Sequence, residues 1–326
     1  MYNYISAIII IFAPAMQYLG EVISLGVACS WTVAALASEV ASRRLGVFVM
    51  NVWRMLLALL LSTLLMLMLS GTWGLQYASP SAWMWLLLSG VVGYFFGDWC
   101  LFNSYLTIGS RYGQLFMTLA PAFTAFSAWV MLGQKLSWAA LLAMAVTLLG
   151  IAISVWHAGK QELPTKGVLF GLGAALGQGL GLVLSKLGLD SYESSMSAEL
   201  LSQTVNYLPF SANSVRCIAG LACYTAWYYW MRPKFRTEHH TFSDSFSNRR
   251  GILAMLIAVL SGPFLGVGFS LMAVQYTAAG IASTLMATTP ILILLPSRWL
   301  FGQRITLRNV VGSIVSVIGV SLFFLL

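Results

Sequence analysis

The sequence predicts an all-α, polytopic membrane protein with about ten transmembrane helices in two inverted five-helix repeats. Of its 326 residues, 59% are hydrophobic and only 8% are charged, whereas a soluble domain carries about 25% charged residues. Apolar stretches of roughly 20 residues, the length that crosses a bilayer as a helix, fill most of the chain. The two halves of the chain also resemble each other, which indicates a duplication.

Apolar runs bounded by glycine, proline and charged residues place the spans along the chain. They lie near residues 20–41, 47–69, 82–107, 112–132, 138–156, 167–188, 213–231, 251–276, 281–300 and 307–325. The first 19 residues hold an apolar run too short to span a bilayer. We therefore expect an N-terminal lead-in at 1–19, a first five-helix repeat at 20–158 and a second at 159–326.

The repeats align over their last three spans. An offset of 169 residues places 93–150 on 262–319 without a gap and aligns Pro121 with Pro290. Because each repeat has an odd number of spans, the second enters the bilayer in the opposite orientation. Inverted repeats are typical of secondary transporters, in which two similar gates flank one midplane site. A non-transporting receptor or scaffold built on the same duplicated fold is the alternative.

Small residues and prolines occupy matching places in the two repeats. Gly173, Gly177 and Gly181 recur every four positions, which puts them on one helix face where a neighbouring backbone can approach closely. An offset of 147 residues places Gly26, Ser30, Ala34 and Ser38 of the first span on Gly173, Gly177, Gly181 and Ser185. Pro121 and Pro290 lie within spans and each predicts a kink. The threonines beside them, Thr118, Thr288 and Thr289, either face substrate or satisfy the bend locally.

An ionisable side chain stands in the apolar stretch GYFFGDWCLFNSY at residues 93–105. Such a residue within a span marks a pathway, a partner or a cavity. Asp98 therefore either binds a cationic group or carries a proton, or else it forms a structural ion pair with one of three basic residues. These are Arg54, Lys186 and Arg216, of which Arg54 and Arg216 occupy matching Asn-x-x-Arg motifs.

Polar and aromatic residues in other spans complete the predicted cavity. Trp31 and Gln178 occupy matching positions, and Trp99 and Asn103 lie on a helix face rotated by about 100° from Asp98. The predicted substrate-binding set is Asp98, Trp99, Asn103, Trp31, Gln178, Thr118, Gln114 and Lys186. Lys186 also matches Glu39 with opposite charge near the end of a span. Both side chains can snorkel to an interface, and Lys186 can alternatively attract an anionic substrate.

Several classes of function lack their motifs. The sequence has no P-loop, no GxGxxG after a strand, no HExxH and no Ser/His/Asp arrangement, so we expect neither an enzyme nor an ATP-driven pump. We expect no cofactor and no metal, because His157, His239 and His240 lie in loops. Cys29, Cys100, Cys217 and Cys223 lie in spans as expected buried thiols. The net charge of +8 comes from scattered residues, which argues against nucleic acid as a partner.

The paired segments APAFTAFSAWVMLGQKLS and TTPILILLPSRWLFGQRIT, with an Arg early in spans two and seven, resemble the EamA-like transporters of the drug/metabolite transporter superfamily over nearly the whole chain. Relatives usually carry glutamate where this chain has Gln134 and Gln303. The resemblance implies a carrier with a central cavity lined by spans 1, 3, 4, 6, 8 and 9 that moves small metabolites such as amino acids, sugars or amphipathic compounds. Small multidrug relatives use a first-span glutamate, and Asp98 is the candidate substitute here.

The same resemblance implies a multi-pass protein of the plasma (cell inner) membrane, with the lipid bilayer and a small-molecule metabolite as partners, a proton as candidate coupling ion, and a monomer or homodimer. Relatives usually have both termini in the cytoplasm. In this chain the positive-inside rule indicates both termini outside, because the loops after odd-numbered spans hold most of the basic residues. Among these are Arg43, Arg44, Arg111, Lys160, Lys166, Arg249, Arg250, Arg304 and Arg308.

Overall fold

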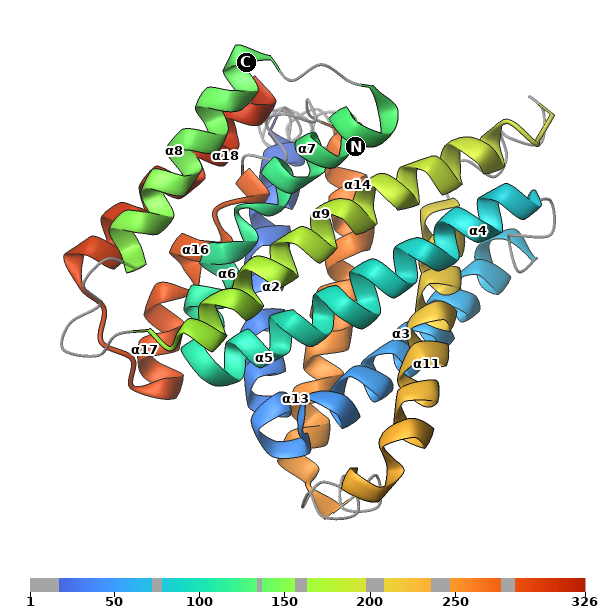
Figure 1. The fold of residues 1–326 in the computed structure, drawn as a ribbon, viewed down its shortest axis with the longest axis horizontal. Helices are drawn as coiled ribbons and strands as arrows, with labels where there is room; N and C mark the ends of the chain where they lie inside the picture. The colour runs from blue at the N-terminus through green and yellow to red at the C-terminus, as the bar shows by residue number, and fades with distance from the viewer. Residues whose placement is uncertain are drawn as a thin grey trace, which may run out of the picture.

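The computed structural model describes residues 18–71, 78–133, 137–155, 163–197, 208–235, 247–276 and 285–325, and almost all of these residues are helical (Figure 1). Most of the predicted lead-in at 1–19 lies outside the described residues. So do His157, His239, His240 and Gln134.

Each of the ten predicted spans overlaps a helical segment of the described residues, and residues 281–284 at the start of the ninth span lie outside them. The first half contains α2 (Leu19–Leu45), α3 (Val47–Ser70), a third span made of α4 (Pro80–Ser89), the π-helix η1 (Gly90–Gly97) and α5 (Asp98–Ile108), a fourth made of α6 (Ser110–Met117) and α7 (Ala120–Leu132), and α8 (Trp138–Val155). The second half contains α9 (Thr165–Glu193), α11 (Leu208–Phe235), an eighth span made of α13 (Arg249–Val259), the π-helix η2 (Leu260–Phe264) and α14 (Leu265–Tyr276), a ninth made of α16 (Thr289–Leu292) and α17 (Leu294–Phe301), and α18 (Leu307–Leu325).

Six described helices are long and apolar enough to cross a membrane. They are Leu19–Leu45, Val47–Met68, Pro80–Ile108, Ser110–Leu132, Trp138–Val155 and Thr165–Glu193, and Thr289–Phe301 and Leu307–Leu322 are shorter apolar helices. Large apolar side chains cover the outside of the bundle, such as Trp138, 87% exposed, and Trp230, 82% exposed. Aromatic side chains exposed in this way are typical of a surface in contact with lipid and its headgroups.

The two halves share the same departures from regular helix. The π-helices η1 and η2 fall at aligned positions of the third and eighth spans. The fourth and ninth spans are interrupted by turns at 118–119 and 287–288, so that Pro121 and Pro290 each sit in the first turn of a new helix. Proline is tolerated there because its missing N–H would have no intrahelical partner. Both spans then end at a left-handed glycine, Gly133 and Gly302.

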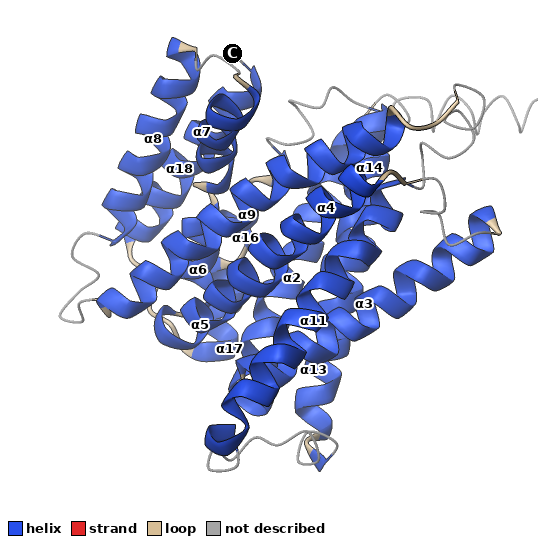
Figure 2. Cartoon of the chain, turned by 45° about the vertical axis from the view of Figure 1, so that its right-hand side comes forward, coloured by secondary structure: helices blue, strands red, loops and turns tan. Residues whose placement is uncertain are grey.

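Contacts between the halves occur in reciprocal pairs. The backbone of Gly150 in α8 approaches Ser316 in α18, and at aligned positions Gly319 in α18 approaches Thr147 in α8. Figures 1 and 2 show these two helices side by side at one edge of the bundle. Reciprocal contacts of this kind are what a twofold relation between two similar units produces.

The same reciprocity holds around the centre of the bundle. A Cβ placed on Gly177 of α9 would lie 3.0 Å from the carbonyl oxygen of Val92, and at the matching place the Ser30 hydroxyl of α2 donates to the carbonyl of Ser261 over 2.7 Å. The third span therefore packs on α9 as the eighth packs on α2. Figure 1 shows α9 running along α4 and α5.

The glycines of α9 set the distance to the third span. A Cβ on Gly177 would also lie 2.7 Å from the Cα of Gly97, and one on Gly181 would lie 3.0 Å from the Cα of Gly93. Real side chains almost never approach a backbone so closely, so the two helices fit only without them.

The cysteines differ from expectation at one position. All four are free, and Cys100 and Cys217 are buried, whereas Cys223 is partly buried. Cys29 is exposed on the surface of the chain, so the prediction of a buried thiol there is wrong. It lies within α2, whose outward face contacts lipid when the helix spans a bilayer.

Candidate functional site

A cavity with a volume of about 500 Å³ lies between the two halves of the bundle. Its walls combine aromatic, methionine and small side chains with a few polar groups, as is usual for small-molecule sites. The lining residues are Trp31, Ala34, Ala35, Ser38, Arg54, Asp98, Leu101, Phe102, Tyr105, Gln114, Met117, Thr118, Ala120, Pro121, Gln178, Ala258, Gly262, Pro263, Met286, Ala287, Thr289, Pro290 and Val320. Every span that the family resemblance implied contributes, together with Arg54 from the second span and Val320 from the tenth.

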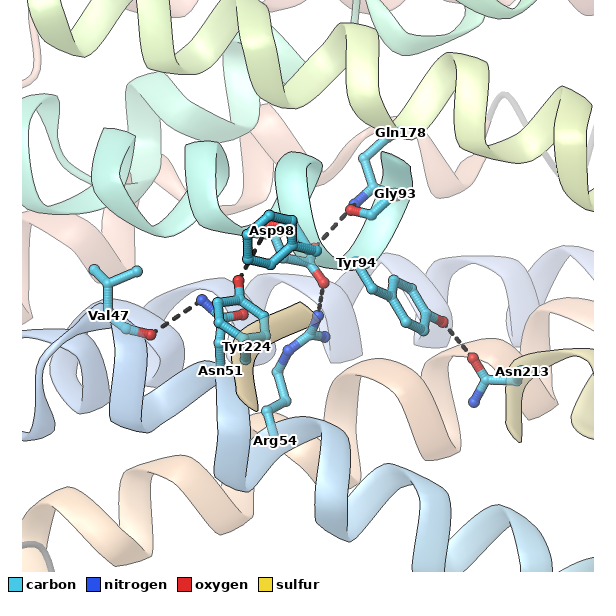
Figure 3. A network of polar contacts seen from close by, with 10 residues as sticks. Val47, Asn51, Arg54, Gly93, Tyr94, Asp98, Gln178, Asn213 and Tyr224 are labelled. Atoms are coloured by element: carbon cyan, nitrogen blue, oxygen red, sulfur yellow. Dashed lines mark hydrogen bonds and ion pairs between the residues drawn. The ribbon is translucent and has the colours of Figure 1, made fainter. Parts of the chain in front are cut away.

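Asp98 lies in the wall of this cavity and is only 3% exposed. It is the first residue of α5, directly after η1. One carboxylate oxygen accepts from the Arg54 guanidinium of α3, and the other accepts from the Gln178 amide of α9 over 2.9 Å (Figure 3). Of the three basic residues proposed as its partner, the structure therefore brings Arg54 to the carboxylate.

Arg54 is held by aromatic rings as well as by the carboxylate. Its guanidinium lies 5.2 Å from the ring centre of Phe102 and 5.7 Å from that of Tyr94. A planar guanidinium both stacks on rings and forks toward a carboxylate, which a lysine ammonium does not. The Asp98–Arg54 pair is thus an electrically neutral unit with both charges at the cavity wall.

Arg216, which matches Arg54 in the second half, has different partners. Its guanidinium lies 4.3 Å from the ring centre of Tyr94, whose hydroxyl donates to the side-chain oxygen of Asn213 (Figure 3). Its Nε is a buried donor that has no hydrogen-bond partner among the described residues. Tyr94 therefore contacts both arginines, and only Arg54 reaches Asp98.

Gln178 and Trp31, the matched pair from α9 and α2, both line the cavity. The Gln178 amide also lies 3.4 Å from the Gly93 carbonyl, to which it donates. The Trp31 indole packs closely on Gly266. The residue that matches Gly266 in the third span is Gly97, and Gly97 packs on the backbone of Gln178. At matched positions of the first and sixth spans, the second half therefore places the hydrogen-bonding amide of Gln178 in the cavity wall, and the first half places the indole of Trp31 there.

The polar residues of the fourth span also face the cavity, and each already makes a hydrogen bond within the protein. The Gln114 amide donates to the Tyr105 hydroxyl over 2.6 Å, and the Thr118 hydroxyl donates to the Leu115 carbonyl over 2.6 Å. The Thr289 hydroxyl likewise donates to the Met286 carbonyl over 3.0 Å. The threonines beside the prolines thus satisfy the helix breaks locally while lining the cavity.

The structure does not bring three of the proposed residues to the cavity. Trp99 packs its ring edge-on against Trp227 with 4.4 Å between ring centres, and the Asn103 amide donates to the Trp99 carbonyl over 2.8 Å. Lys186 is 59% exposed and forms an ion pair with Asp190 over 3.1 Å. Trp99 and Asn103 follow the face of α5 that lies about 100° from Asp98, as the helical period dictates.

Two lining residues were absent from the predicted set although the sequence held a signal for them. Tyr105, 1% exposed, lies on the same face of α5 as Asp98 and Phe102, at spacings of three and four residues. Ser38 continues the four-residue ladder of α2, in which Ala34 also lines the cavity. The sequence already places both residues on these faces, so the predicted set should have included them.

Comparisons with known proteins identify a family and a solved structure of similar fold. A model of the EamA-like transporter family matches residues 18–156 and 165–325. A solved structure described as "Crystal structure of protein" is similar over 93% of this chain and 96% of that chain, with a TM-score of 0.56 and 18% sequence identity. At this identity the likeness concerns the fold alone. A search of curated proteins found no match.

Proposed function

The chain belongs to the EamA-like transporter family, and from this premise we propose that it is a secondary transporter that moves a small metabolite by alternating access through the Asp98 cavity. The observation that carries the proposal is the position of the cavity, whose walls come from both halves of the bundle. A site between two similar halves can be exposed to either side when the halves rock against each other.

We propose further that the two repeats are inverted in the membrane. The reciprocal contacts of Gly150 with Ser316 and of Gly319 with Thr147 support a twofold relation between the halves. Five helical segments in each half support opposite orientations, because an odd number of crossings ends on the side opposite its start. The glycine face of α9 and the helix breaks at Pro121 and Pro290 would then supply the sliding contacts and the hinges.

The polar groups of the cavity have defined roles in this proposal. A substrate carrying a charged group exchanges partners with the Asp98–Arg54 pair: it becomes the counter-charge of one side chain, and the other must then be neutralised. Gln178 and Gln114 offer further hydrogen bonds, and Trp31 with Phe102 forms the apolar wall. In the plasma membrane such a carrier would import or export the metabolite according to its gradients.

A proton is the candidate coupling ion, with Asp98 as its carrier. Among the described lining residues Asp98 is the one carboxylate. In this structure Arg54 is the counter-charge of Asp98, so a substrate group that takes the place of Asp98 at Arg54 would leave the carboxylate free to exchange a proton. Coupling through Asp98 therefore requires that substrate binding and the loss of the ion pair occur together.

Transport by the purified chain in proteoliposomes tests the function. A thermal-shift screen of amino acids, sugars and amphipathic amines first selects compounds that stabilise the fold, and their radiolabelled forms are then offered with and without a pH gradient. We expect saturable uptake of at least one compound, accelerated by a proton gradient. A folded chain that moves none of them would favour the alternative of a receptor or scaffold.

A cavity-filling variant tests whether the cavity is the route. Ala287→Phe places a ring in the lining, and Leu295→Phe places the same ring at a half-exposed position on the outside of α17. We expect Ala287→Phe to abolish uptake and Leu295→Phe to retain it. Equal uptake by both variants would show that substrate follows another path.

A further inference from the structure

Two ion pairs at opposite ends of the bundle occupy the same places in the two repeats with their charges exchanged. The first is Glu39–Arg43 near the end of α2, and the second is Lys186–Asp190 near the end of α9. The offset of 147 residues that aligns the first and sixth spans places Glu39 on Lys186 and Arg43 on Asp190. In each pair the two partners are four residues apart, about one helical turn.

In the first pair Arg43 is 48% exposed, whereas the Glu39 carboxylate is buried in the protein and does not snorkel to an interface. Glu39 is 0% exposed, and its carboxylate accepts from the Arg43 guanidinium over 2.7 Å and from the backbone N–H of Ser110 over 2.7 Å. Ser110 is the first residue of α6, so Glu39 caps the positive N-terminal end of that helix. Its neighbour Ser38 lines the cavity. The carboxylate thus fastens α2 to the start of the fourth span at one end of the cavity.

Contacts between the halves surround this cap. The Arg43 guanidinium lies 5.7 Å from the ring centre of Phe301, at the end of α17. Arg111 donates to the Arg304 carbonyl over 2.9 Å, and Asn309 donates to the Tyr112 hydroxyl over 3.2 Å. The first half is therefore held against residues 301–309 of the second half at this end.

The second pair is open. The side chains of Lys186 and Asp190 are 59% and 50% exposed. Among the described residues, the two form an ion pair with each other and with no other charged side chain. A lysine cannot accept from a helix N-terminus as Glu39 does, since its ammonium has donors and no acceptor. Because of the exchanged charges, Lys186 cannot cap a helix N-terminus as the Glu39 carboxylate caps α6.

The closed end also buries polar atoms that have no partner. Half of the buried side-chain atoms without a hydrogen bond in the described residues lie there, namely Ser42 Oγ, Ser110 Oγ, Arg111 Nε and Gln303 Oε1. Buried polar atoms of this kind raise the free energy of the closed conformation, and water would pair with them once this end opened. The closed end is therefore held by the Glu39 cap and the contacts between the halves, while water that reaches these unpaired atoms offsets part of the cost of opening it.

We infer that Glu39–Arg43 is a gate that seals one end of the cavity and that Lys186–Asp190 is its counterpart at the other end. The exchanged charges make the first gate the stronger of the two. The chain therefore rests with the cavity closed at the Glu39 end. This inference rests on the proposed transport function, because two alternately closing gates serve a carrier. When the Glu39 gate opens, α9 packs its Lys186–Asp190 turn toward Leu132 at the end of α7, the counterpart of Phe301.

The rate at which a probe labels a cavity residue reports whether each gate is open, and this measurement does not require a known substrate. The reporter is Ser38→Cys in the full chain, reconstituted in sealed vesicles, and the probe is a membrane-impermeant maleimide added from one side at a time. Labelling is quantified at residue 38 by peptide mass spectrometry, which separates it from the four native cysteines. We expect rapid labelling from the Lys186 side and slow labelling from the Glu39 side.

Two changes then shift the gates in opposite directions. Glu39→Gln removes a charge-assisted hydrogen bond and should speed labelling from the Glu39 side by about tenfold. The double change Lys186→Glu with Asp190→Arg gives the second gate the charges of the first and should slow labelling from the Lys186 side. Because both of its positions are exposed, the double change keeps the inference testable if Glu39→Gln fails to fold. Arg44→Gln and Glu193→Gln remove exposed charges beside each gate and should leave labelling unchanged.

Opposite shifts in the two variants support the gates. Labelling that neither variant changes overturns them, whether or not the chain transports. Failure of transport with gates that respond as expected instead overturns the proposed function alone.

Discussion

The third and eighth spans have the same backbone and different chemistry. Both pass through a π-helix at aligned positions, and both pack on the first span of the other half. Directly after η1 the third span presents Asp98, where the eighth span has Val267 after η2. The duplicated fold therefore sets where the helices cross, while single substitutions decide which half carries the charge.

The largest effect should come from removing the charge that distinguishes the two spans. Asp98→Asn leaves the Arg54 guanidinium buried without a counter-charge, which should lower the free energy of unfolding by about 3–5 kcal/mol. Denaturant titration in detergent micelles measures it. The double change Asp98→Asn with Arg54→Gln should recover much of the loss, and a single change without effect would mean that the pair is hydrated.

The next effect concerns the close packing of the third span on α9. Gly177→Ala brings a Cβ to 2.7 Å from the Cα of Gly97, and such overpacking should lower the free energy of unfolding by about 1–3 kcal/mol. Gly26→Ala is the matched control, because nothing lies within 4 Å of that position. It should stabilise α2 slightly through helix propensity. Equal behaviour of the two variants would refute the packing.

A smaller effect is expected at the place in α2 that matches Gly177. Ser30→Ala removes the hydroxyl that donates to the Ser261 carbonyl and should lower the free energy of unfolding by about 1 kcal/mol. In Ser24→Ala the lost bond is to Gly20 within the same helix, so its loss should be smaller. If both changes prove equal, the bond between the halves adds nothing.

The smallest effect should be found at the open gate. Lys186→Ala removes one partner of an exposed ion pair and should change the free energy of unfolding by less than about 0.5 kcal/mol. A loss well above about 1 kcal/mol would show that the pair is buried in solution, contrary to the conformation described.

The helices could be predicted from the sequence because hydrophobic length and breaking residues are local signals. The offset between the halves also predicted which positions correspond, and the reciprocal contacts of Gly150 and Gly319 agree with that alignment. The partner of Asp98 could not be selected, because Arg54 and Arg216 carry the same motif: both contact the Tyr94 ring after folding, and Arg54 is the one that reaches the carboxylate. Trp99 and Asn103 were included although their helix face pointed elsewhere. Lys186 was included because its ammonium could attract an anionic substrate, and the sequence does not show that the side chain is exposed and paired with Asp190.

The contact between α8 and α18 has a consequence for assembly. Two separate half-length chains would have to meet by diffusion to form it, at a yield that depends on their abundance in the membrane. Joined in one polypeptide, the two surfaces face each other at an effective concentration in the millimolar range. The cavity can then form at any level of expression, and mispaired combinations of like halves are suppressed.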